Sequence, residues 1–81
     1  IINHIISYNK GDFMISYEPF WATLKRKNVT TYALREKYNI SPNTLTRMKN
    51  NKYLSMRTIE DFCRILDCRI EDIAEYVPDK K

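Results

Sequence analysis

Asn43 and Arg47 lie four residues apart in a chain of 81 residues, within a segment, 41–52, that contains no carboxylate. Residues with this spacing share one face of an α-helix. An asparagine amide can pair bidentately with adenine, and an arginine guanidinium with guanine, in the major groove of DNA. The spacing therefore predicts a helical surface that can read base edges.

Hydroxyl, amide and ammonium groups surround this pair. The hydroxyls of Thr44 and Thr46 can contact bases or phosphates, whereas Lys49, Asn50 and Lys52 follow at the far end, where backbone phosphates would pass. From residue 25 to residue 57 the chain has nine basic residues and one acid, a net charge of +8, although the whole chain carries only +4. A merely solvated helical surface usually mixes both signs, so this bias indicates an electrostatic footprint for phosphate.

Two short helices must position these groups. Thr30 is expected to cap the first, over residues 31–38, with Leu34 and Tyr38 as its buried stripe. Asn39 is expected to end this helix, because asparagine tolerates the left-handed backbone conformation better than most residues. The chain then turns sharply toward the second helix.

The second helix is predicted over residues 41–50. Ser41 supplies its cap and Pro42 suits its first position, while Leu45 and Met48 are expected to face inward. Two capped helices joined by a tight turn are typical of a helix-turn-helix, in which the second helix lies in the major groove.

Three further helices complete the prediction: one that opens at Glu18-Pro19, one over about 56–67 and a short one over about 70–76. The expected fold class is therefore all-α, with five helices. Segments 2–8 and 13–17 are β-branched and aromatic, and could form a hairpin or an arm. We accordingly predict an extension over 1–16, with Met14 as an alternative natural start, a helix-turn-helix domain over 17–77 and a tail over 78–81.

Other classes of function are poorly supported. The chain has one histidine and one glycine, and therefore neither an acid–base constellation nor a glycine-rich phosphate loop, so we expect no enzyme. Cys63 and Cys68 stand five apart on one predicted helix, so their side chains should diverge, and together with His4 they do not make a zinc site. We expect no metal or cofactor. Without an apolar run of about 18 residues or a secretory signal, we expect a cytoplasmic protein.

Residues 31–50 also resemble the helix-turn-helix of the Cro and phage-repressor type, the xenobiotic-response-element family. The motif has apolar residues at the positions of Leu34, Tyr38 and Ile40, and buried residues at the positions of Leu45 and Met48. The segment SMRTIEDFCRILDCRIEDI is similar to the fourth and fifth helices of that family. The resemblance thus covers about residues 17–77, and MISYEPFWATL with EDIAEYVPDK looks like a subgroup of short regulators of low-GC bacteria.

The resemblance implies a five-helix repressor-like fold and a dimeric, sequence-specific binder of double-stranded DNA, which we expect to act as a repressor. The positions implied to read bases are Pro42, Asn43 and Arg47. The positions expected to contact or support the DNA backbone are Thr31, Arg35, Thr44, Thr46, Lys49, Asn50 and Lys52. Two departures stand out, since the family usually has a small residue at Arg35 and a glycine at Asn39.

Two alternatives remain open. The same fold could serve as a protein-interaction module, of the antitoxin or anti-repressor type, through the acidic segment after residue 57 and the apolar N-terminal arm. RNA binding is a third reading, although we expect little aromatic stacking surface beside the basic residues. The homodimer interface could be either the arm or the last predicted helix.

Overall fold

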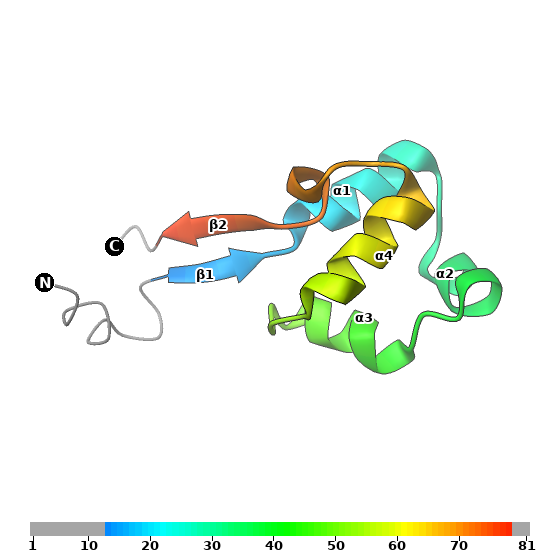
Figure 1. Cartoon of the computed structure of the whole chain (residues 1–81), viewed down its shortest axis with the longest axis horizontal. Coiled ribbons are helices and arrows are strands. Elements are labelled where there is room, and N and C mark those ends of the chain that lie inside the picture. The colour runs from blue at the N-terminus through cyan, green and yellow to red at the C-terminus, as the bar shows by residue number, and fades with distance from the viewer. Residues whose placement is uncertain (1–12, 79–81) are drawn as a thin grey trace, which may run out of the picture.

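The computed structural model describes residues 13–78, and within them it forms four α-helices, one 3₁₀ helix and a two-stranded sheet (Figure 1). In chain order these are β1 (Phe13–Ser16), α1 (Glu18–Lys27), α2 (Thr31–Tyr38), α3 (Pro42–Lys49), α4 (Met56–Leu66), η2 (Ile70–Asp72) and β2 (Glu75–Pro78). No helix of the described part is long and apolar enough to cross a membrane. The mainly helical fold predicted from the sequence is confirmed.

Side chains and backbone turns set the limits of the helices. At the start of α2, α3 and α4, the hydroxyls of Thr30, Ser41 and Ser55 each accept a hydrogen bond from a backbone N–H, at 3.0 to 3.1 Å. At the ends of α1, α2 and α4 the chain adopts the left-handed conformation, with positive φ at Asn28, Asn39 and Asp67. In a chain with a single glycine, asparagine and aspartate take over this role because they tolerate positive φ.

The core draws on every helix. Phe20, Leu34, Met48 and Phe62 come from α1 to α4 in turn and are fully buried, as is Ile73 after η2. The rings of Phe20 and Phe62 meet edge to face, with centroids 4.9 Å apart. One shared core therefore fixes the two helices of the helix-turn-helix against α1 and α4.

The predicted fifth helix over 70–76 is wrong. The helical turn ends at Asp72, where η2 stops, and Glu75 begins the strand β2. Tyr76 and Val77 are residue types that favour strands. Because β2 pairs antiparallel with β1, the backbone N–H and C=O groups of this segment form hydrogen bonds across the strands, and a helix would not satisfy more of them.

The two strands form a ribbon that extends from one end of the helical body (Figure 1). Met14 lies opposite Val77, and Ile15 opposite Tyr76. The predicted pairing of segment 13–17 with its sequence neighbour 2–8 cannot be compared directly, since 2–8 lies outside the described residues. What the structure shows is that β1 pairs with the far end of the chain.

Two side-chain expectations also change. Tyr38 was predicted to be buried but is 44% exposed, because it is the last residue of α2, and Ile40 instead returns the chain to the core. The prediction that Cys63 and Cys68 diverge along one helix is wrong as well. α4 ends at Leu66, and the left-handed Asp67 folds Cys68 back toward Cys63.

Candidate nucleic-acid interface

The helix-turn-helix occupies residues 31–49, with α2 and α3 joined by a turn of three residues, 39–41. The N–H of Ile40 donates to the carbonyl of Leu34 at 3.0 Å, which closes the end of α2 and directs the chain into α3. Leu45 and Met48 fasten α3 to the core. The opposite side of α3 is therefore turned to solvent.

All three predicted base-reading residues lie on that solvent side. Pro42, Asn43 and Arg47 are exposed, and so are Thr46 and Lys49. Thr44 is only half-buried, so its hydroxyl lies at the edge of this surface. We name the exposed side of residues 42–52 the α3 face.

The predicted supporting residues surround the α3 face. Thr31 is exposed in the first turn of α2, and the exposed Arg35 places its guanidinium 5.9 Å from the centroid of the Tyr32 ring. The family usually has a small residue at this position. Here the Arg35 side chain lies outside the packed contact between the two helices. Asn50 donates one amide hydrogen to the carbonyl of Thr46, at 3.0 Å, which leaves its second amide hydrogen for another acceptor.

Arg47 has a structural contact that the sequence does not reveal. Its Nη2 donates to the backbone carbonyl of Tyr53 at 2.7 Å, and its own carbonyl accepts from the N–H of Lys52 at 2.8 Å. The arginine therefore ties the end of α3 to the loop that follows it. This geometry holds the guanidinium near the last turn of α3 before any DNA is bound.

Tyr17 is a residue of this region that sequence reasoning missed. It is only 2% exposed, just before α1, and its hydroxyl donates to the carbonyl of Lys52 at 2.7 Å. Burial raises the pKa of the Tyr17 hydroxyl, and the positive charge of Arg47 acts in the opposite direction. Because Tyr17 and Lys52 are 35 residues apart, no local pattern could signal that one positions the other.

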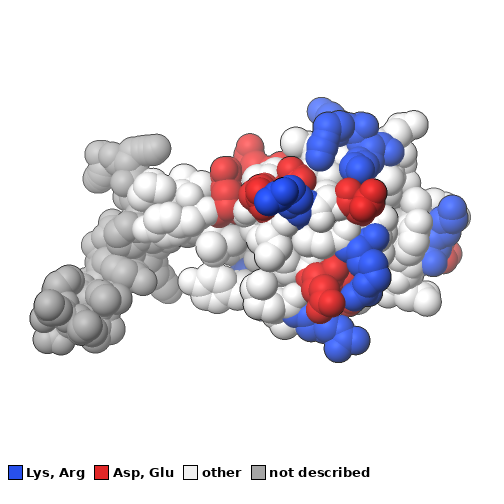
Figure 2. All heavy atoms as spheres, turned by 45° about the horizontal axis from the view of Figure 1, so that its top comes forward, with Lys and Arg blue, Asp and Glu red and all other residues white. Residues whose placement is uncertain are grey.

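Within the described chain, no basic side chain of the α3 face is paired with an acidic one. Arg47, Lys49 and Lys52 take part in no ion pair there, whereas every charged residue in the ion pairs observed belongs to α1, to α4 or to the segment 69–72. Figure 2, which looks toward α1, η2 and α4, shows acidic and basic side chains interspersed on that side. The positive charge of the α3 face therefore remains available to an anionic ligand.

Exposed aromatic rings accompany these cations, contrary to the sequence expectation. The ring of Tyr32 is 64% exposed and lies beside the Arg35 guanidinium, and Tyr53, which is 75% exposed, accepts the Arg47 hydrogen bond through its backbone carbonyl. A phenol hydroxyl can donate to a phosphate oxygen. The two tyrosines therefore extend the candidate interface beyond the residues that sequence reasoning selected.

Fold and surface together define a helix-turn-helix domain with a basic, carboxylate-free second helix. The model of the Cro/C1-type helix-turn-helix DNA-binding domain matches residues 20–79, and the chain belongs to this family. Among solved structures, the chain is similar to that of the transcriptional regulator VanUg, with 25% identity and a TM-score of 0.76. That alignment covers 89% of this chain and 93% of VanUg. A search of curated proteins found no match.

Proposed function

We propose that this protein is a sequence-specific regulator of transcription, a repressor that inserts α3 into the major groove of double-stranded DNA. The observation that carries the proposal is the α3 face, which is exposed, free of carboxylates and free of ion pairs in the described chain. Phosphate neutralisation supplies much of the affinity of such proteins for DNA. The family and the likeness to a transcriptional regulator support the same function.

Within this proposal, Asn43 and Arg47 read bases, and Pro42 contacts a thymine methyl group. The hydrogen bond from Arg47 to the carbonyl of Tyr53 is compatible with this role, because a guanidinium has five N–H donors and this contact engages Nη2 alone. The positions proposed to contact or support the phosphate backbone are Thr31, Arg35, Thr44, Thr46, Lys49, Asn50 and Lys52.

We further propose that the protein binds DNA as a homodimer, through the outer edge of β1. Within residues 13–78 the sheet consists of β1 and β2 alone. An isolated two-stranded ribbon is marginal in water, and an unpaired strand edge is a template for another strand. Glu75 and Pro78 discourage pairing at the edge of β2, whereas β1 has the uncharged sequence FMIS without proline. Two copies joined along β1 would form a four-stranded sheet with twofold symmetry. Each copy would then read one half-site, about one helical turn (~34 Å) from the other.

Selection of bound duplexes from a random DNA pool, with the full chain, tests sequence-specific binding. We expect enrichment of a palindromic motif, and a complex of two chains per duplex by analytical ultracentrifugation. A reporter gene with the selected motif across its promoter should lose expression when the protein is present. An unenriched pool would refute sequence-specific binding, and a stimulated reporter would refute repression.

The competing function, a protein-interaction module, loses part of its basis. Its acidic surface was to be the segment after residue 57, but Glu60 and Asp61 already pair with arginines of α4. A protein that binds no duplex in the selection, yet forms a stoichiometric complex with a partner protein, would reinstate that reading.

A further inference from the structure

The end of α4 brings the two cysteines of the chain together. The N–H of Cys68 donates to the carbonyl of Cys63 at 3.1 Å, across the left-handed Asp67. This is the hydrogen bond of a Schellman turn, which is frequently accompanied by contact between the side chains of the two residues concerned. At the end of α1 the same bond joins Val29 to Leu24, and there the two side chains are an ordinary apolar pair. At the end of α4 the equivalent pair consists of two thiols.

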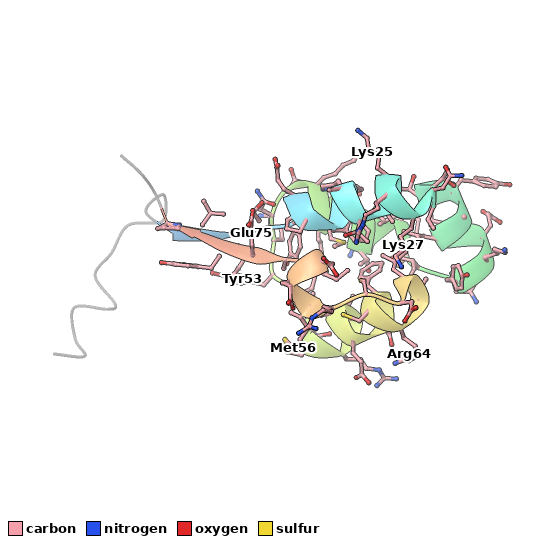
Figure 3. The ribbon with its side chains drawn as sticks, turned by 90° about the horizontal axis from the view of Figure 1, so that it is seen from above. Lys25, Lys27, Tyr53, Met56, Arg64 and Glu75 are labelled. Carbon is pink, nitrogen blue, oxygen red and sulfur yellow. The ribbon has the colours of Figure 1, made fainter. Side chains whose placement is uncertain are left out.

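Both cysteines are free and half-buried, so their thiols can be reached from solvent. The two side chains are close enough for a hydrogen bond between them to influence the pKa of Cys63. They line one open pocket of about 330 Å³ between α4 and η2, together with Met56 and Ile70. Figure 3 shows Met56, which is 66% exposed, at the start of α4 beside η2. A small thiol-reactive molecule therefore has an apolar path to the pair.

We propose that Cys63 and Cys68 form a reversible dithiol–disulfide site, which is oxidised by a low-molecular-weight disulfide that enters through this pocket. One thiol loses its proton, and its thiolate attacks one sulfur of the small disulfide, which forms a mixed disulfide and releases one small thiolate. The second cysteine, as thiolate, then attacks the protein sulfur of the mixed disulfide and releases the second small thiolate. Two protons and two electrons leave the protein, and the small disulfide is reduced to two thiols.

The surroundings of the pair set its reactivity. Burial raises the pKa of both thiols, and the carboxylates of Glu60 on α4 and Asp72 on η2 act in the same direction on Cys63. Glu71 adds to this effect at Cys63, while Lys27 on α1 lowers the pKa of Cys68. The thiolate is the reacting form. At pH values below the raised pKa, the rate of the first step should therefore increase about tenfold for each unit by which the pH rises. The second step is intramolecular and should follow quickly.

Glutathione disulfide tests the proposal on the reduced full chain. We expect the protein to lose two hydrogens in intact mass, to retain no glutathione, and to recover fully with dithiothreitol. Trypsin cuts after Arg57, Arg64 and Arg69, so without reduction peptides 58–64 and 65–69 should remain joined. This measurement needs no variant.

Single substitutions provide the matched control. Cys63→Ser and Cys68→Ser, checked for folding by circular dichroism, should each retain one glutathione as a stable mixed disulfide. If the unsubstituted protein also retains glutathione, forms disulfides between chains, or stays a dithiol at a pH where each single variant reacts, the proposal is overturned.

Discussion

Helices α3 and α4 are built in the same way and differ in what their outer sides carry. Each begins after a serine whose hydroxyl accepts a backbone N–H, and each buries one side in the common core. On the outer side of α4, Arg57 lies 3.8 Å from Asp61, and Arg64 lies 3.6 Å from Glu60. On α3 there is no acid at all, and its cations face solvent.

This difference between the outer sides of α3 and α4 affects the binding of an anionic partner far more than it affects the stability of the fold. Ion pairs one turn apart on an exposed helix contribute only a few tenths of a kcal/mol each, so α4 gains little stability from them. Their larger consequence is that α4 neutralises its own charge and presents a mixed surface. Since α3 does without such partners at little cost in stability, its positive charge stays available for a polyanion. The following predictions test this division, beginning with the largest expected effect.

The buried sides of the two helices should be equally important for stability. Phe62→Ala in α4 should lower the free energy of unfolding by about 3–5 kcal/mol, and Met48→Ala in α3 by about 2–5 kcal/mol, because both side chains are fully buried. Urea denaturation followed by circular dichroism measures both. If one variant keeps its full stability, the helices do not share one core.

The outer sides should differ in DNA binding. Arg47→Ala should weaken binding to the selected site by about 1–3 kcal/mol, since it removes the guanidinium that we propose to read a base. Arg64→Ala on α4 is the matched control and should leave affinity unchanged, because within residues 13–78 its side chain pairs with acids of its own helix. Fluorescence anisotropy measures both. Equal losses would abolish the distinction, and an unchanged affinity for Arg47→Ala would refute the assignment of α3.

Tyr17→Phe should lower stability by about 0.5–1.5 kcal/mol, because the carbonyl of Lys52 loses its buried donor. The folded-state pKa of Tyr17 is raised above the ordinary value of about 10, so the stabilising neutral hydroxyl is fully present below pH 10. Its contribution is lost as pH rises through the raised folded-state pKa. Urea midpoints from pH 8 to 11 should therefore decline less steeply in the variant. Parallel declines would exclude Tyr17 as the titrating group.

Lys52→Ala should have the smallest effect on DNA affinity, and this effect should discriminate least between DNA sequences. Its ammonium is exposed at the end of the α3 face and is assigned to a phosphate. Affinities for specific and random duplexes should fall alike, and the slope of log affinity against log salt should decrease by about one. Titrations at several salt concentrations measure this slope. A loss confined to the specific duplex would assign Lys52 to a base instead.

Local patterns were sufficient to predict much of this molecule. The caps at Thr30, Ser41 and Ser55 depend on hydrogen bonds within three residues, and all three are present. The inward positions of Leu45 and Met48 follow from helical periodicity. The solvent exposure of Asn43 and Arg47 follows from the same periodicity, whereas their roles on DNA remain predictions.

The failures lie where a helix ends, where the chain reverses, or where a distant segment supplies the partner, and helical periodicity signals none of these. Glu75–Pro78 is a strand because β1 pairs with it across most of the chain, although its preceding turn looked like the start of a helix. Tyr38 appeared apolar and periodic, but its place at the last position of α2 left it at the surface. A reversal of the chain at one residue, Asp67, likewise brought together two cysteines that a continuous helix would have kept apart.

The sequence by itself determined the first four helices, nearly all of their limits, most of their buried positions and the excess of positive charge around the helix-turn-helix, because these depend on hydrogen bonds and periodicities spanning a few residues. Only the tertiary structure decided that the chain ends as a strand on β1, that Tyr17 supports the loop after α3, and that Cys63 meets Cys68. Those contacts depend on how the chain reverses and on which segments the shared core brings side by side, and no local pattern carries that information.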